Sequence, residues 1–398
     1  MSNTSEFSTP IRLSERTHKM RSSAIREMLK QLDTPGMISL AGGNPAPESF
    51  PMHLMADLQA QVLSRYGHRA LQYSETEGFA PLREAVAQML RNQGIPAEAS
   101  RILITNGSQG VLDALAKVFL DRGTPIGLEN PTYLGALQAF APYDPLFVPL
   151  ECDAQGATPR GIHSMLQNHP RSLLYLMPTF QNPSGRSAGL TRRCEIAAVI
   201  ESEQCLVIED DPYSALRYEG DSQLPLAALC PERVLYMGTL SKVFAPGLRL
   251  GYCLAPAWLF PWLVKAKQGT DLHTGTLVQA MAAQYINAGH MKIQLPKTCE
   301  LYSKRRDAML EALDIWMPSQ FHWTRPQGGM FLWLEGPEEF DSARLLPKAL
   351  ALGVAFVTGN AFFTDSCMGS HCLRLNFTLP NEAQIHEGIR RIGQALAA

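Results

Sequence analysis

Short β-rich runs alternate with helical patterns over most of this chain, and this alternation constrains the fold more than any other feature. It extends from about residue 54 to about residue 288. Parallel strands need a crossover connection, usually a helix, so the alternation predicts a largely parallel sheet covered on both faces. The run at 251–254 follows its neighbour without an obvious crossover helix, which favours one antiparallel strand. The clearest runs are 102–105, 125–128, 172–177, 205–209, 234–237 and 251–254.

The pattern changes beyond about residue 290. A long helix at 295–313 is followed by Gly-Gly-Met-Phe-Leu-Trp-Leu, an apolar run typical of a strand. A further helix, strands near 354–357 and 373–377, and a closing helix at 382–397 complete a smaller α+β unit. A chain of 398 residues also exceeds what one hydrophobic core usually supports. We therefore expect an N-terminal arm and helix over 1–50, a large domain over 51–290 and a small domain over 291–398.

The arm contains one short amphipathic pattern, at about 23–32, and then the segment AGGNPAPESFP. So many glycines and prolines exclude a helix or a central strand. We expect this segment to run extended across a surface.

Composition excludes several classes of partner. The net charge of -2 gives no electrostatic reason to expect nucleic acid or an anionic membrane. No apolar stretch approaches the length of a membrane span, and the polar N-terminus lacks the core of a secretory signal. The eight cysteines form no C-x-x-C pair and the ten histidines no H-E-x-x-H motif, so free thiols and no metal site are expected. These features predict a cytoplasmic protein.

Ligands of parallel sheets bind outside the carboxyl ends of the strands, so the residues just after each predicted strand are the candidates for a site. The turn Asn-Gly-Ser-Gln-Gly at 106–110 opens a helix after one strand. Backbone amides at a helix N-terminus stabilise a phosphate, and Ser108 adds a hydroxyl donor. Taken alone, the same turn would suit an ordinary helix cap.

The turn Asp-Asp-Pro-Tyr at 210–213 follows another strand. A buried carboxylate here would keep a pyridine nitrogen protonated and make that ring an electron sink. Tyr213 would then hydrogen-bond a phenolate oxygen on the same ring. An Asp-Pro turn with solvated charges is the alternative for this motif taken by itself.

Lys242 follows the strand at 234–237, among small and apolar residues. Desolvation lowers the pKa of a lysine and frees its amine as a nucleophile, which suits an imine-forming residue. Thr239, Ser241 and Arg249 flank it and would reach a phosphate. Two loops add an aromatic ring, Tyr133, and an amide, Asn182.

Together these motifs resemble the fold-type I, class I/II aminotransferases, which are pyridoxal-5′-phosphate enzymes. The resemblance runs in order from about residue 20 to the C-terminus. The stretches at 23–30, 38–47 and 71–78 resemble the 2-aminoadipate and kynurenine/aminoadipate aminotransferase branch. The motifs that carry it are Ser108-Gln109, Tyr133, Asn182-Pro183-x-Gly185, Asp210-x-x-Tyr213, Ser241-Lys242, Arg249 and Arg374.

The resemblance implies an α/β fold of type I, with a mostly parallel sheet between helices in the large domain and a smaller α+β C-terminal domain. It also implies that Lys242 binds the cofactor covalently and later carries the proton. Asp210 would pair with the pyridinium nitrogen, Asn182 and Tyr213 would bond the ring oxygen, and Tyr133 would stack on the ring. The phosphate would be held by Ser108, Gln109, Thr239, Ser241 and Arg249.

The same resemblance assigns the substrate contacts. Arg374 and Gly43, together with Asn182, would receive the α-carboxylate, and Arg26 would meet a distal carboxylate. Tyr73 would reach the phosphate of a partner subunit, which implies a homodimer with shared active sites. Asn44 departs from the apolar residue that is frequent in that branch, and this departure concerns the range of substrates.

The predicted function is a ping-pong transamination between an L-amino acid, 2-aminoadipate by preference, and 2-oxoglutarate. Aromatic or branched-chain amino acids remain alternative donors, and a lyase or decarboxylase is an alternative reaction because a fold does not determine chemistry. A non-catalytic regulator domain would need a basic DNA-binding extension ahead of residue 20. A plain dinucleotide-binding domain would need G-x-G-x-x-G after its first strand, which is missing from the sequence.

Overall fold

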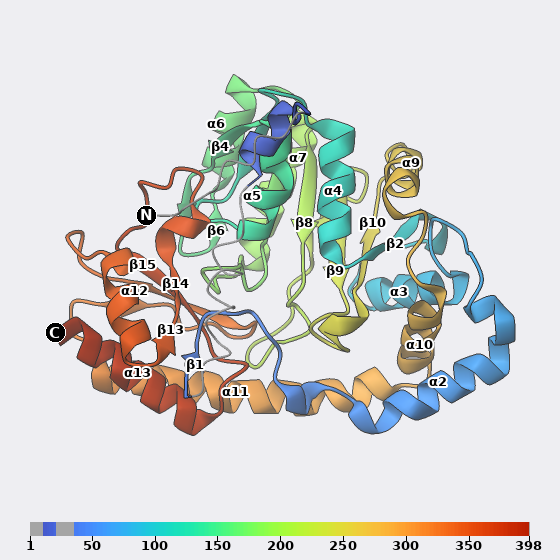
Figure 1. Ribbon diagram of the computed structural model, residues 1–398. Helices are drawn as coiled ribbons and strands as arrows, with labels where there is room; N and C mark the ends of the chain where they lie inside the picture. The colour runs from blue at the N-terminus through green and yellow to red at the C-terminus, as the bar shows by residue number, and fades with distance from the viewer. Residues whose placement is uncertain (1–10, 21–35, 398) are drawn as a thin grey trace.

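The computed structural model describes residues 11–20 and 36–397 (Figure 1). Its largest element is a seven-stranded sheet, in which β10 runs antiparallel to both of its neighbours and the other six strands share one direction. All six predicted runs are strands of this sheet, and the expected antiparallel strand is confirmed. The strands in spatial order are β2 (Ile102–Asn106), β10 (Leu250–Leu254), β9 (Val234–Thr239), β8 (Leu206–Asp210), β7 (Leu173–Leu176), β3 (Pro125–Leu128) and β4 (Leu146–Pro149).

Both faces of the sheet are buried, because successive side chains of each strand enter two different cores. On β8, for example, Ile208 belongs to one hydrophobic cluster and Val207 to the other. The first face is covered by α4 (Ser108–Phe119), α5 (Leu134–Phe140) and α9 (Phe260–Asp271). The second face is covered by α3 (Ala80–Asn92), α6 (Pro159–Asn168), α7 (Leu190–Glu203), α8 (Leu226–Leu229) and α10 (Thr276–Asn287), with α2 (Met52–Tyr66) packed beyond them.

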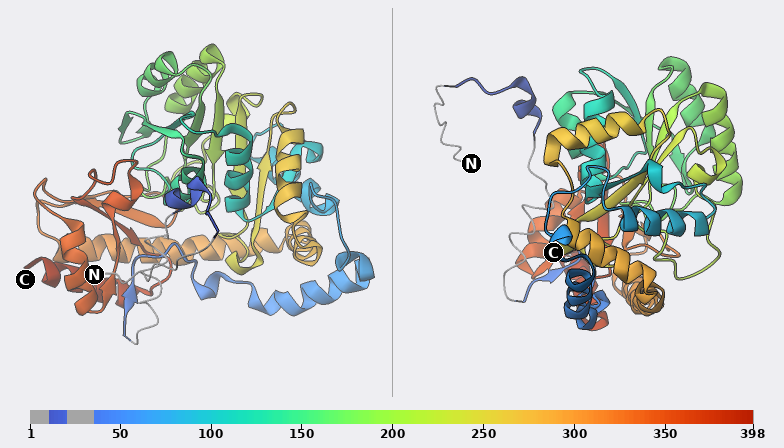
Figure 2. Two further views of the ribbon diagram at one scale, coloured as in Figure 1. Left: turned by 45° about the horizontal axis from the view of Figure 1, so that its top comes forward. Right: turned by 90° about the vertical axis from the view of Figure 1, so that its right-hand side faces the viewer.

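The C-terminal part forms a second, antiparallel sheet of four strands. Helix α11 (His290–Trp316) extends along the molecule from α10 to α13, so it packs against both parts of the structure (Figures 1 and 2). The predicted boundary at residue 290 falls where α11 begins, and the domain division stays a prediction. The remaining elements are β11 (His322–Trp323), β12 (Phe331–Glu335), β14 (Val357–Thr358), β15 (Cys372–Asn376), α12 (Ser342–Ala351) and α13 (Glu382–Ala397).

Three local predictions were wrong. The run at 354–357 is two elements, because β13 (Val354–Ala355) pairs with β1 (Ile38–Ser39) whereas β14 pairs with β15. The long helix begins five residues earlier than expected, with Pro296 inside it. The segment AGGNPAPESFP is only partly at the surface: Asn44, Pro47 and Glu48 are exposed, but Ala46 is buried, and its N–H donates to the Tyr302 hydroxyl over 2.9 Å. The segment contacts both α11, through Tyr302, and the small sheet, through Arg374. The predicted helix at 23–32 lies outside the described residues.

The described part of the chain has neither a membrane-spanning helix nor a metal-binding group. None of its helices is both long and apolar enough to cross a membrane. No group of three or more His, Cys, Asp and Glu side chains there could hold a metal ion.

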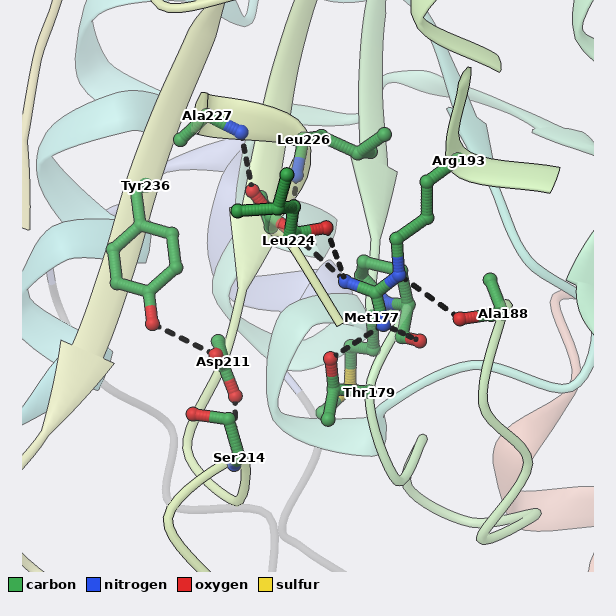
Figure 3. Close-up of polar contacts among 12 residues, drawn as sticks. Met177, Thr179, Ala188, Arg193, Asp211, Ser214, Leu224, Leu226, Ala227 and Tyr236 are labelled. Carbon is green, nitrogen blue, oxygen red and sulfur yellow. Dashed lines mark hydrogen bonds and ion pairs between the residues drawn. The ribbon is translucent and has the colours of Figure 1, made fainter. Parts of the chain in front are cut away.

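A buried ion pair joins β8 to the helices behind the sheet (Figure 3). The Arg193 guanidinium lies 3.9 Å from the Glu209 carboxylate, and both side chains are about 1% exposed. Arg193 also donates to the backbone oxygens of Ala188 and Pro178 and to the Thr179 hydroxyl. Burial raises the pKa of Glu209 to about 7, and Arg193 opposes this shift. The pair therefore stabilises a charge that could not stand alone in the core.

Arg193→Met should destabilise the protein by about 3–5 kcal/mol at neutral pH, because it leaves the buried Glu209 carboxylate without its cation. Urea unfolding measures this change. Arg160→Met is the matched control, since it breaks an arginine–glutamate pair that lies at the surface, where screening by water leaves little to lose. Equal stability of the two variants would contradict the role of Arg193.

Candidate active site

A cavity of about 310 Å³ opens at the carboxyl ends of the parallel strands, where the sequence placed the candidate residues. Of the predicted cofactor and substrate residues that the structure describes, all but Tyr73 line it. The predicted residues that line it are Gly43, Ser108, Gln109, Tyr133, Asn182, Asp210, Tyr213, Thr239, Ser241, Lys242, Arg249 and Arg374.

One end of the cavity is built to receive an anion. The N-terminus of α4 presents Ser108 and Gln109 to it, and no side chain of the described residues caps the first turn of this helix. The Thr239 and Ser241 hydroxyl oxygens lie 2.9 Å apart on the neighbouring turn. The Arg249 side chain completes this end. A dianion such as a phosphate suits this set of hydroxyl, amide and guanidinium donors.

Two glycines make that close packing possible. Gly107 has a φ of +74°, and a Cβ there would collide with the Arg249 guanidinium. A Cβ at Gly251 would collide with the backbone between Gly107 and Ser108. The start of β10 therefore lies directly against the start of α4, and the arginine is brought to the helix N-terminus.

Lys242 projects into the centre of the cavity, where its Nζ donates to the Gly43 carbonyl oxygen over 2.9 Å. Burial, together with the positive charges of Arg249 and Arg374, lowers the pKa of Lys242 to about 8. A lysine with this pKa is partly unprotonated near neutral pH, and the unprotonated amine is the nucleophile. The position suits an amine that forms an imine.

Asp210 lies at the end of β8 and is 2% exposed. Its Oδ2 accepts a hydrogen bond of 2.5 Å from the Tyr175 hydroxyl, whereas its Oδ1 is buried and lacks any hydrogen-bond partner among the residues described. Burial raises the pKa of Asp210 to about 7, against the effect of the Tyr175 hydrogen bond. A buried carboxylate oxygen without a donor is costly. A protonated ring nitrogen of a bound cofactor would satisfy it, so this residue fits a pyridinium partner.

Arg374 lies opposite, on β15, and is 1% exposed. It donates to Asn182 Oδ1 over 2.8 Å and to the Ala41 carbonyl oxygen over 2.7 Å, and its Nε has no partner in residues 36–397. Phe331 stacks under the guanidinium, with 4.1 Å from Cζ to the ring centroid. Burial lowers the pKa of Arg374 to about 10. Since no carboxylate of the described residues pairs with it, the cation is available for a carboxylate that enters the cavity.

One predicted residue of the described chain, Tyr73, does not line the cavity. Tyr73 is 79% exposed, and its ring meets His273 edge to face at 5.8 Å between centroids. Its predicted reach into a partner's site stays a prediction. Arg26 lies outside the described residues.

Four other residues of the site were missed, namely Phe331, Met177, Pro212 and Pro246. Asn44, which the sequence connected with the range of substrates, also lines the cavity. Phe331 was read only as part of a strand, and nothing local in the sequence ties it to an arginine more than forty positions away. Tyr175 did carry a signal: a tyrosine in the middle of an apolar strand needs a partner for its hydroxyl group, and Asp210 ends the adjacent strand.

Comparison with known proteins agrees with this geometry. The family model described as aminotransferase class I and II matches residues 35–392. An aromatic-amino-acid aminotransferase of Thermococcus litoralis is 42% identical over 390 residues, which cover 96% of this chain and 93% of that protein. A 2-aminoadipate transaminase of Thermus thermophilus is 40% identical over 383 residues, which cover 95% and 94%.

The crystal structure of a kynurenine aminotransferase of Pyrococcus horikoshii, in complex with PMP, superposes with a TM-score of 0.92 at 38% identity, over 97% of this chain and 96% of that one. The predicted fold of type I, with a mostly parallel sheet between helices, is therefore confirmed. From the match over nearly its whole length, the chain belongs to the class I and II aminotransferases.

Proposed function

We propose that this aminotransferase moves the amino group of an L-amino acid, with 2-aminoadipate as the first choice, to 2-oxoglutarate by a ping-pong reaction. The observation that carries the proposal is the meeting of three buried groups in one cavity: the Lys242 amine, the free Oδ1 of Asp210 and the Arg374 guanidinium. Each suits a different part of the chemistry, namely covalent capture, ring protonation and binding of a carboxylate.

Pyridoxal 5′-phosphate is the cofactor, and when bound it supplies an electron sink for the carbanion left by removal of the α-proton. The anion-binding end of the cavity, made by Ser108, Gln109, Thr239, Ser241 and Arg249, would hold its phosphate. Asp210 would keep the ring nitrogen protonated. Tyr213 and Asn182 would bond the ring oxygen, and Tyr133 would cover the ring.

Lys242 has two tasks in this scheme. Its low pKa leaves part of the amine unprotonated, and in that form Nζ would hold the cofactor covalently until an amino acid replaces it. The freed Nζ would then take the α-proton of the substrate and pass it to a carbon of the cofactor. Arg374 fixes the orientation of the substrate by binding the α-carboxylate, so that the α-proton points toward Nζ.

The substrate class rests on resemblance and on charge. A relative 40% identical is named a 2-aminoadipate transaminase, and Arg26 matches the position that meets a distal carboxylate in that branch. The alternative donor is an aromatic amino acid. It is supported by the 42% identity to an aromatic-amino-acid aminotransferase and by the Phe331 and Tyr133 rings that line the cavity.

A homodimer and a cytoplasmic location complete the proposal. Tyr73 lies beside His273 and is exposed in its own chain. A residue that reaches into a partner subunit must be exposed in this way. All eight cysteines are free, which suits a reducing compartment.

The experiment that tests the function is a set of half-reactions followed by absorbance. Purified protein loaded with pyridoxal phosphate should lose its visible band when an amino acid converts the cofactor to the pyridoxamine form, and the fastest donor of a panel names the substrate. We expect 2-aminoadipate to react faster than phenylalanine, leucine or alanine. Product analysis that finds a 2-oxo acid excludes a lyase or decarboxylase. A loaded protein that no amino acid converts would refute the proposal.

Lys242→Ala should lower the rate of the half-reaction by at least about 10³-fold, because both the covalent link and the proton carrier are lost. Stopped-flow absorbance with the preferred donor measures the rate. Lys265→Ala serves as the control, since Lys265 is an exposed lysine that packs over Trp262 outside the cavity. Near wild-type turnover by Lys242→Ala would show that another group carries the proton.

Arg26→Ala should raise the KM for 2-aminoadipate roughly tenfold or more and leave the KM for leucine almost unchanged, because only the former has a distal carboxylate to bind. Steady-state kinetics with both donors test this split. Arg12→Ala removes a charge from an exposed side chain of the same N-terminal region and should change neither KM. Equal losses on both donors would mean that Arg26 has a structural role only.

A further inference from the structure

The cavity depends on a residue that does not line it. Tyr175 lies on β7, is fully buried, and donates its hydroxyl proton to Oδ2 of Asp210 over 2.5 Å. Its ring packs edge to face against Phe140 of α5, with 6.2 Å between centroids and 81° between planes. The phenol is thus held by the core on one side and by a carboxylate on the other.

Because of this contact, the two carboxylate oxygens of Asp210 differ in their surroundings. Oδ2 is bound by the protein, and Oδ1 is buried without a hydrogen-bond partner in the described chain, on a residue that lines the cavity. A carboxylate with one oxygen fixed cannot rotate freely about its terminal bond. The other oxygen therefore keeps one direction.

We propose that Tyr175 is the positioning residue for Asp210: it holds Oδ2 so that Oδ1 remains ionised and directed at the ring nitrogen of the bound cofactor. The inference rests on the proposed role of Asp210. It adds a residue from a neighbouring strand to the groups that control protonation of the ring.

The chemistry of a phenol suits this task. Burial, followed by the charge of Asp210, raises the pKa of Tyr175 well above its ordinary value, so the hydroxyl keeps its proton and acts only as a donor. A donor to a carboxylate favours its charged form, and this opposes the burial that raises the pKa of Asp210. A neutral donor does so without a second positive charge, which would compete with the pyridinium nitrogen for the same carboxylate.

The residue that follows the strand provides an internal comparison. Asp211 faces the other side of the sheet, where Tyr236 donates to its Oδ2 over 2.7 Å and the Ser214 amide donates to its Oδ1 over 2.9 Å (Figure 3). Both oxygens of Asp211 are therefore satisfied by the protein. Asp210 has the same kind of tyrosine partner and one oxygen left over. The difference marks Asp210 as the carboxylate reserved for a ligand.

The two tyrosines form a matched pair for the test. Tyr175→Phe and Tyr236→Phe each remove one buried hydroxyl that donates to an aspartate at the end of β8 or just after it, and both proteins should remain folded by circular dichroism because the rings stay in place. The probe is pyridoxamine 5′-phosphate titrated into the full-length apoprotein, since this form of the cofactor makes no covalent bond with Lys242. The second readout is the NMR chemical shift of the ring nitrogen in isotopically labelled cofactor.

Tyr175→Phe should weaken the binding of pyridoxamine phosphate roughly 10- to 100-fold, the range for a hydrogen bond to a charged group, and move the ring-nitrogen shift toward the unprotonated value. Tyr236→Phe should alter neither. Unchanged affinity and shift in Tyr175→Phe, or equal changes in both variants, would overturn the inference.

Asp210→Asn separates this inference from the proposed function. If Asp210→Asn loses both affinity and ring protonation while Tyr175→Phe behaves as wild type, the role of Asp210 stands and that of Tyr175 falls. If Asp210→Asn changes neither readout, Asp210 is not the partner of the ring nitrogen, and the inference on Tyr175 falls with it.

Discussion

Burial of charge at the carboxyl edge of the large sheet is the condition on which the rest of the site depends. Lys242, Asp210 and Arg374 come from three strands or strand ends, and burial shifts the pKa of each toward the neutral form. In water these groups would be an ordinary ammonium, carboxylate and guanidinium. Removed from water, Asp210 Oδ1 and Arg374 Nε lack a hydrogen-bond partner in the described chain, and Lys242 Nζ donates to the Gly43 carbonyl oxygen. The interactions that these groups can still make indicate the chemistry of the ligand: an electrophilic carbon for Lys242, a basic ring nitrogen for Asp210 and a carboxylate for Arg374.

A sheet covered on both faces makes this burial possible, and it also keeps structure and chemistry apart along a single strand. At the end of β8, Glu209 and the following Asp211 point to one side, where Arg193 and Tyr236 satisfy them. Asp210, the last residue of the strand, points to the other side, into the cavity. Because side chains alternate, a run of three acidic residues at a strand end can stabilise the fold with two of them and reserve the middle one for the reaction.

Much of this arrangement was predictable from the sequence, because the candidate residues directly follow strands whose carboxyl ends must meet. Lys242 and Asp210 were found in that way, and the resemblance to a family added Arg374. The sequence could not reveal contacts made across long separations, such as Phe331 beneath Arg374 or the N–H of Ala46 on Tyr302. The sequence also predicted one strand at 354–357 where the structure has two, since β13 pairs with β1 and β14 pairs with β15. The role of Tyr175 was not predicted, because its sequence neighbours are apolar and its hydroxyl group contacts Asp210 on the adjacent strand.

The segment before α2 meets both cations of the cavity through its backbone. The Ala41 carbonyl oxygen accepts from Arg374, and the Gly43 carbonyl oxygen accepts from Lys242. Carbonyl groups are common to all residues, so these two contacts depend on the path of the segment and not on its side chains. Substitutions that preserve the path can therefore accumulate beside the substrate while the catalytic groups keep their positions. In the evolution of such enzymes, this segment is therefore a region where substrate specificity can change while the reaction stays the same.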